Sequence, residues 1–253
     1  GEPDAAPDTI EENLVRVGAP EVWDLGVRGQ GVVVGGNDTG IDWDHPALIT
    51  HYRDQQPGYD RHDFNWHDAI HTTGSSCGAN SPVPCDDYGH GTHTLGTIVG
   101  DDGAGNQIGM APGAKWIGCR NMNNGDGTPA TYIECFEFFL APYPLNETAI
   151  LGDPALAPDV INNSWGCPTS EGCDLDTLEA SVEALRQAGI VVVVSAGNGG
   201  YSGCNTIDDP PAIYQQSFTV GAFDHETDLI ASLSSRGPVT YNSQTYVKPD
   251  IAA

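Results

Sequence analysis

The 253-residue chain carries 35 acidic residues against 9 basic ones, which gives a formal net charge of -26 at pH 7. This charge repels phosphate backbones and anionic lipid, so neither nucleic acid nor a membrane surface is an expected partner. No apolar run reaches the roughly 18 residues that a membrane span needs, and the first residues lack the basic-then-apolar order of a signal peptide. We therefore expect a mature, soluble chain, and the length favours one domain.

Short apolar runs alternate with helix-period patterns along the chain. After an amphipathic stretch near residues 14–25, we expect strands at 31–37, 115–119, 159–164, 190–194 and 218–221. Helices are expected to begin at His90 and to cover 132–140 and 175–188. Strands that alternate with helices predict a parallel sheet with right-handed crossovers.

Residues 51–88 have no clear periodicity and are rich in Asp, His, Gly and Pro. They are expected to form long surface loops, with their histidines mostly facing solvent. These histidines are His51, His62, His67 and His71.

The seven cysteines predict disulfides and an oxidising, extracellular setting. Two pairs flank short loops, and a third could join a strand to a helix. The favoured pairs are Cys77 with Cys85, Cys167 with Cys173, and Cys119 with Cys135. Cys204 is then left over, and it could be buried, bond a separate chain or replace one partner in the 167–173 pair. Zinc is not expected, because the chain has no Cys-x-x-Cys pair.

Three polar residues lie where a parallel sheet places functional groups, at the ends of strands or the start of a helix. Asp38 ends the first predicted strand, His90 opens a helix in a glycine-rich turn, and Asn198 follows the strand at 190–194. A histidine oriented by a carboxylate can act as a general base, and an asparagine amide can donate to a developing oxyanion. Taken singly, Asp38 could cap a turn and Asn198 could satisfy loop backbone. Together they predict catalysis that still requires a nucleophile.

Five motifs follow one another at 33–42, 90–97, 163–166, 195–198 and 248–253. In this order they resemble the signatures of the subtilisin family of serine endopeptidases, most of all its secreted, bacillopeptidase-like branch. The resemblance implies a three-layer α/β fold, with a mostly parallel central sheet and helices on both faces. It also implies that Asp38 is the triad aspartate, His90 the general base and Asn198 the oxyanion donor. An aspartic protease, which shares the Asp-Thr-Gly motif, would need a second copy and a β-rich chain.

The resemblance also implies a peptide-binding strand and a wall of the first specificity pocket. The residues are Ser164, Trp165 and Gly166 for the strand, and Ser195, Ala196 and Gly197 for the wall. Because all but Trp165 are small, we expect an open pocket that accepts apolar side chains rather than a charged one. Trp165 either faces a neighbouring subsite or packs in the core.

The family's nucleophilic serine lies in a Gly-Thr-Ser-Met-Ala segment some tens of residues beyond the last motif. Residues 1–253 do not contain this segment, and Ser234 and Ser235 lie in a different context. We therefore expect one peptidase domain that is incomplete at its C-terminal end, with the serine in a missing or separate segment. This chain alone should then be essentially inactive. The alternative is a catalytically inactive pseudoenzyme that binds a peptide or a partner.

No cofactor is expected for the chemistry, although structural calcium is possible. The family's common calcium site would have Ala47 in place of an aspartate ligand, which argues against that site. Asp250 is a candidate ligand of a weaker cation site. The expected partners are protein or peptide substrates and a C-terminal fragment that carries the serine.

Overall fold

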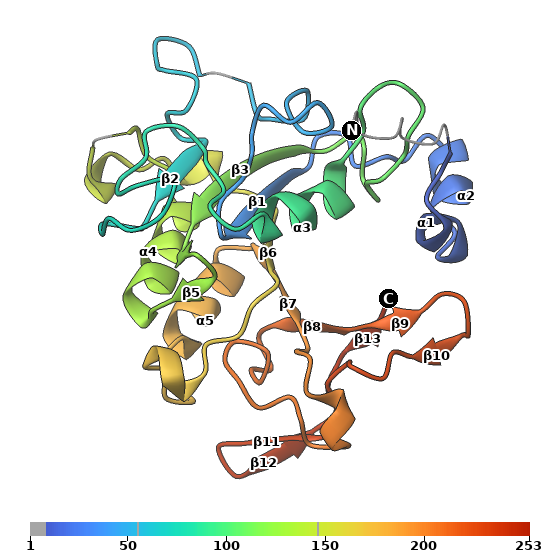
Figure 1. Ribbon diagram of the computed structural model, residues 1–253. Coiled ribbons are helices and arrows are strands. Elements are labelled where there is room, and N and C mark those ends of the chain that lie inside the picture. Colours follow the sequence, from blue (N-terminus) through green and yellow to red (C-terminus); the bar gives the residue numbers. More distant parts are fainter. Residues whose placement is uncertain (1–8, 55, 146) are drawn as a thin grey trace.

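The computed structural model describes residues 9–54, 56–145 and 147–253 (Figure 1). Its centre is a seven-stranded sheet with the order β13-β8-β7-β6-β1-β3-β2, in which every neighbouring pair is parallel. The strands are β1 (Val33–Asp38), β2 (Trp66–Asp68), β3 (Lys115–Arg120), β6 (Val160–Asn163), β7 (Val191–Ser195), β8 (Phe218–Gly221) and β13 (Ile251–Ala252). The α/β fold with a parallel central sheet is thus confirmed.

Helices cover both faces of the sheet (Figure 1). One face packs against α3 (His90–Val99), and the other against α4 (Pro129–Leu140) and α5 (Glu179–Gln187). Consecutive residues of β3 point to opposite faces of the sheet and are buried on both. Trp116 belongs to the core under α3, and Ile117 to the core under α4 and α5. Two short helices, α1 (Glu12–Arg16) and α2 (Ala19–Asp24), precede the sheet. Among the described residues, no helix combines the length and hydrophobicity that crossing a membrane requires.

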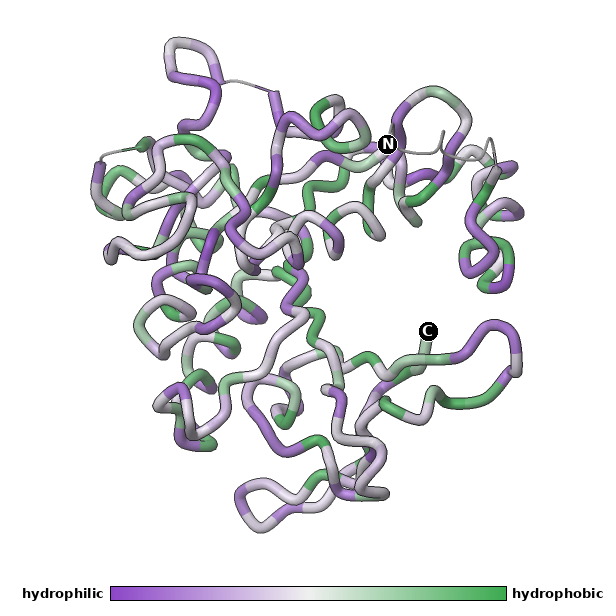
Figure 2. The backbone as a smooth tube through the Cα atoms, in the orientation of Figure 1, coloured by the Kyte–Doolittle hydropathy of each residue, from purple (hydrophilic) through white to green (hydrophobic). Residues whose placement is uncertain are grey.

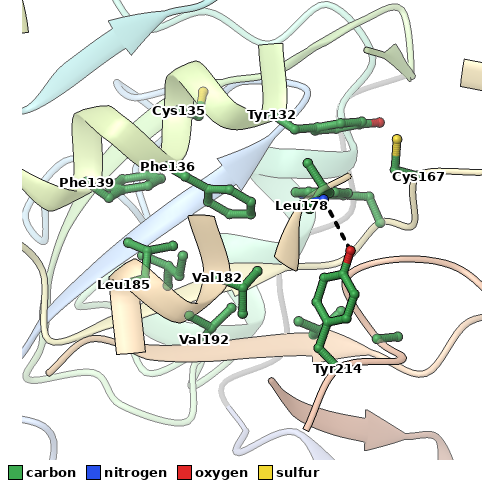
Figure 3. Close-up of a cluster of buried hydrophobic side chains, with 14 of the residues drawn as sticks. Tyr132, Cys135, Phe136, Phe139, Cys167, Leu178, Val182, Leu185, Val192 and Tyr214 are labelled. Atoms are coloured by element: carbon green, nitrogen blue, oxygen red, sulfur yellow. Dashed lines mark hydrogen bonds between the residues drawn. The ribbon is translucent and has the colours of Figure 1, made fainter. Parts of the chain in front are cut away.

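The larger core fills the space between the sheet and the pair α4 and α5 (Figure 3). Phe136 and Phe139 of α4 meet Val182 and Leu185 of α5 there, and all four are fully buried. Each such side chain contributes about 1.5–3 kcal/mol by leaving water. Because β1 has Gly35 below this layer, the Phe139 ring lies where a side chain would stand, 2.9 Å from an added Cβ.

The described residues of 51–88 are mostly loops and turns, as the sequence predicts, but they do not all lie at the surface. They supply β2, and they bury His51 and His62, which were expected to face solvent. Both imidazoles have internal partners, since His62 Nδ1 lies 3.1 Å from the Tyr52 hydroxyl and His51 Nδ1 lies 3.3 Å from the Ala114 carbonyl. Burial lowers the pKa of His62. Figure 2 shows hydrophilic and hydrophobic residues mixed along this segment, without a continuous hydrophobic run like that of β7.

The described residues also form three small hairpins. They are β4 (Met122–Asn123) with β5 (Asp126–Gly127), β9 (Phe223–Asp224) with β10 (Leu229–Ile230), and β11 (Val239–Tyr241) with β12 (Gln244–Tyr246). The sequence does not predict them, because strands of two or three residues have no measurable periodicity.

The three predicted disulfides are all present. They join Cys77 to Cys85, Cys119 to Cys135, and Cys167 to Cys173. The second bond ties β3 to α4, as expected of a pair in a strand and a helix. Cys204 is free and exposed.

Arg120, wholly buried at the end of β3, holds the segment that leads to α3. Its guanidinium makes two parallel bonds to Asp68, with Nε 2.9 Å from Oδ1 and Nη2 3.0 Å from Oδ2. Nη1 lies 3.2 Å from Asp87 Oδ2, and Nη2 donates to the Gly78 carbonyl at 2.6 Å. Nη1 also lies 3.4 Å from Ser75 Oγ, so one side chain of the sheet contacts four residues of the 66–88 segment.

We predict that Arg120→Met destabilises the protein by about 3–5 kcal/mol, because it leaves two buried carboxylates without their cation. Chemical denaturation measures the loss. The matched control is Arg186→Met, since the Arg186 side chain is 60% exposed and its ion pair lies on the surface. That change should stay within about 0.5 kcal/mol. Equal effects of the two substitutions would contradict this role of Arg120.

Candidate active site

Helix α3 begins at His90 because Asp86 accepts the amide hydrogens that the first helical turn leaves free. Asp86 Oδ1 accepts from Tyr88 N at 3.1 Å and from Gly89 N at 2.8 Å, and Oδ2 accepts from Thr92 N at 2.9 Å. Burial raises the pKa of Asp86, but these bonds and one from the Thr92 hydroxyl outweigh it and leave the pKa below its usual value. The φ of Gly89 is 89°, a left-handed value that favours glycine.

Two glycines bring the start of α3 against the end of β1. A Cβ on Gly91 would overlap the Gly40 carbonyl oxygen, and one on Gly40 would overlap the Cys85 carbonyl. The Thr39 hydroxyl bridges the two elements, accepting from Gly91 N at 3.0 Å and donating to Asp86 Oδ1 at 2.8 Å. Backbone contact of this kind places the side chains at the two element ends within bonding distance.

Asp38 and His90 are the pair placed in this way. His90 Nδ1 lies 2.7 Å from Asp38 Oδ1, which also accepts from Thr39 N at 2.8 Å. The carboxylate is 2% exposed, whereas the imidazole is 42% exposed. The hydrogen bond that His90 donates to Asp38 raises the pKa of His90 against the opposing effect of burial. It also favours the tautomer with hydrogen on Nδ1, so that Nε2 faces outward as an acceptor.

Asn198 lies just beyond β7, after Gly197, whose φ is 95°. Its side chain is exposed and makes no hydrogen bond within the described part of the chain. Both amide hydrogens are therefore free to donate to a bound group.

Two adjoining cavities connect these residues. The smaller, of about 250 Å³, is lined by His90 and Thr39. The larger, of about 470 Å³, is lined by Asn198. Both share the segment 164–166 and Glu171, so they meet along that segment. All six predicted substrate-binding residues line the larger cavity, namely Ser164, Trp165, Gly166, Ser195, Ala196 and Gly197.

The side chain of Trp165 packs in the core, the second of its two expected positions. The residue is 6% exposed. Its ring stacks on Tyr132 with centroids 3.9 Å apart, and its Nε1 donates to the Asn37 carbonyl at 2.8 Å. Trp165 thus anchors the 164–166 segment beside the end of β1.

The expectation of an uncharged pocket is wrong. Glu171, Asp208 and Asp209 line the larger cavity, and they come from loops outside the motifs that suggested the pocket. Glu171 Oε2 accepts from the Tyr132 hydroxyl at 2.6 Å. Sequence reasoning missed these carboxylates because only the tertiary fold brings them to the cavity, although the Asp-Asp-Pro-Pro sequence at 208–211 marks a loop.

The remaining candidates have structural partners. Ser235 Oγ accepts from Gly199 N at 2.8 Å, and Ser234 Oγ accepts from Ala222 N at 2.9 Å. Asp250 Oδ2 lies 2.6 Å from the Lys248 ammonium. Within the described ranges, no group of three or more His, Cys, Asp or Glu residues is arranged to hold a metal ion. The cation site at Asp250 stays a prediction.

Comparison with known proteins decides the family. A model of the subtilase family of peptidases matches residues 29–253. The chain belongs to the subtilase family. The family predicted from the five motifs is thereby confirmed, and the chain has subtilisin-type serine proteases among its relatives.

Three relatives of this subtilase come from Bacillus subtilis. Bacillopeptidase F is 40% identical over 98% of this chain and 16% of its own length. Serine protease AprX is 37% identical over 67% of this chain and 38% of its own length. The minor extracellular protease Vpr is 26% identical over 97% of this chain and 27% of its own length. The chain therefore spans well under half the length of each of these relatives.

We predict that Asp38→Asn lowers the pKa of His90, because the neutral amide no longer stabilises the imidazolium. An NMR titration of the imidazole measures this shift. Stability should change with it, since a raised folded-state pKa stabilises the protein below about pH 6.5 and this contribution is lost as the pH rises through the folded-state pKa.

The control for this titration is Asp44→Asn, which removes an exposed carboxylate from the same segment. It should leave the titration of His90 almost unchanged. A His90 pKa that is the same in the wild type and in Asp38→Asn would show that Asp38 does not orient a chargeable base.

Proposed function

We propose that this subtilase hydrolyses peptide bonds with a triad of Asp38, His90 and a serine. The observation that carries the proposal is the 2.7 Å contact between buried Asp38 and His90. His90 Nε2 would take the proton of the serine hydroxyl during attack and return it to the leaving amine. Asp38 would stabilise the imidazolium formed between these steps, and the free amide of Asn198 would donate to the oxyanion. The reaction is complete without a cofactor, because side chains supply every group.

We place the serine in a segment outside the 253 residues. In the described part of the chain, no serine hydroxyl hydrogen-bonds to His90, and Ser234 and Ser235 are engaged with backbone amides. Residues 1–253 would then form one peptidase domain that the serine-bearing segment completes. Without that segment the chain would lack the nucleophile and be essentially inactive.

The substrates proposed are extended protein or peptide chains. The segment 164–166 follows β6 and lines both cavities, so an extended chain lying there would pair with its backbone as an added strand. Secretion is part of the proposal. Three disulfides favour an oxidising compartment, and one relative is named an extracellular protease.

A fluorophosphonate probe tests the proposal on the enzyme purified with its serine-bearing segment. The probe should label one serine of that segment, and His90→Ala should slow labelling by about 10⁴-fold or more, because the general base is lost. A folded enzyme that binds peptide but takes no label would contradict the peptidase and favour the pseudoenzyme.

We further predict that Asn198→Ala lowers kcat by about 10²- to 10³-fold with little change in KM, a magnitude taken from serine proteases of this family. Steady-state kinetics on a peptide substrate measure it. The control is Asn13→Ala, at an exposed position of α1 remote from both cavities. If Asn198→Ala instead raised KM at constant kcat, Asn198 would bind the ground state rather than the oxyanion.

A further inference from the structure

The larger cavity is lined by acidic side chains that have no role in the proposed peptide hydrolysis. Its lining includes Glu171, Asp208 and Asp209, and neither a lysine nor an arginine. Its other walls are mainly small, with Ala196 and Ala212 among them. The cavity therefore combines short apolar walls with uncompensated negative charge.

Asp209 lies beside the segment that would hold the substrate backbone. A Cβ built on Gly166 would be 3.2 Å from Asp209 Cβ and 3.6 Å from Oδ2. The next residue, Pro210, accepts from Cys167 N at 2.7 Å, and the Cys167–Cys173 disulfide closes the adjoining loop. The backbone that carries Asp209 is thus fixed next to Gly166, and the carboxylate lies close to that glycine.

Asp209 also lacks an internal partner. It is half-buried, and it makes no hydrogen bond or ion pair among the residues that the structure describes. Burial first, and then the charge of Asp208, raise the pKa of Asp209. Glu171 differs, because it accepts from the Tyr132 hydroxyl. Asp208 is exposed, so water screens its charge. A cation entering the cavity would therefore gain most from Asp209.

We propose that the larger cavity binds a lysine or arginine side chain of the substrate and that Asp209 is its counter-charge. The methylene stem would lie along Ala196 and Ala212, and the charged head would reach the carboxylate. The net charge of -26 would favour the approach of basic chains. This assignment rests on the proposed peptidase function.

Asn198 shows which residue of the substrate is selected. It lines the same cavity and would donate to the carbonyl oxygen of the cleaved bond. The side chain entering the cavity beside it therefore belongs to the residue that carries this carbonyl, immediately before the cleaved bond.

The test compares peptide substrates that differ only at this residue. Arginine is set against citrulline, its uncharged isostere, in the enzyme purified with its serine-bearing segment. We expect kcat/KM to favour arginine by about 100-fold, since a half-buried carboxylate discriminates less than a fully desolvated one. Asp209→Asn should reduce the preference to about 5-fold or less. Asp174→Asn, which removes an exposed carboxylate outside the cavity, should leave it intact.

Binding of p-aminobenzamidine, a planar amidinium, separates this inference from the peptidase proposal because it needs no turnover. Asp209→Asn should weaken binding by about 10-fold or more, and Asp174→Asn should not. If fluorophosphonate labelling fails but binding depends on Asp209, the peptidase proposal falls and the cation pocket stands. If the enzyme labels and cleaves arginine and citrulline substrates equally well, the cation pocket is overturned and the peptidase stands.

Discussion

The site depends on one close approach, that of the first turn of α3 to the end of β1. Gly40 and Gly91 have no room for a side chain, because backbone atoms occupy the positions of their Cβ atoms. With the two backbones in contact, the side chains of Asp38 and His90 meet at 2.7 Å. Any larger residue at either glycine would separate the elements, and the carboxylate would no longer reach the imidazole. The requirement for glycine is therefore steric at both positions, and at Gly40 the φ of 109° favours glycine as well.

Polar contacts, together with buried Trp66 and the Cys77–Cys85 disulfide, hold the segment that delivers His90. Arg120 binds Asp68 and Asp87, and Asp86 gathers the amides of the turn before the helix. Buried charges of this kind stabilise little by themselves, but removing one partner is costly, so they favour one arrangement over its alternatives. That property suits a segment of irregular backbone. Each polar contact fixes one residue of this segment. A segment without a repeating hydrophobic pattern has no apolar face that could fix several residues together.

The sequence predicts some parts of this molecule well and others not at all, for physical reasons. Strands such as β7 are continuous apolar runs, so the run itself marks them. The carboxyl ends of the parallel strands then locate Asp38 and Asn198. The burial of His62 could not be predicted from a local pattern, because it depends on a tertiary partner, the Tyr52 hydroxyl. The place of Asp209 in the cavity could not be predicted for the same reason. Its neighbour Gly166 lies more than forty positions earlier, and only the folded chain brings the two together.

The acidic side chains of the site differ in where their hydrogen-bond donors come from. Asp86 receives donors from its own turn, and its pKa lies below the usual value despite burial. Asp38 accepts from Thr39 N and pairs with His90. Asp209 has no donor within the described chain, and its pKa is raised. Asp38 and Asp86 receive hydrogen bonds from groups inside the protein, whereas Asp209, which receives none from the described residues, lines the cavity. A ligand that brings its own N–H donors and positive charge would complete the set, and among the side chains of a protein substrate only lysine and arginine bring a permanent charge of that sign.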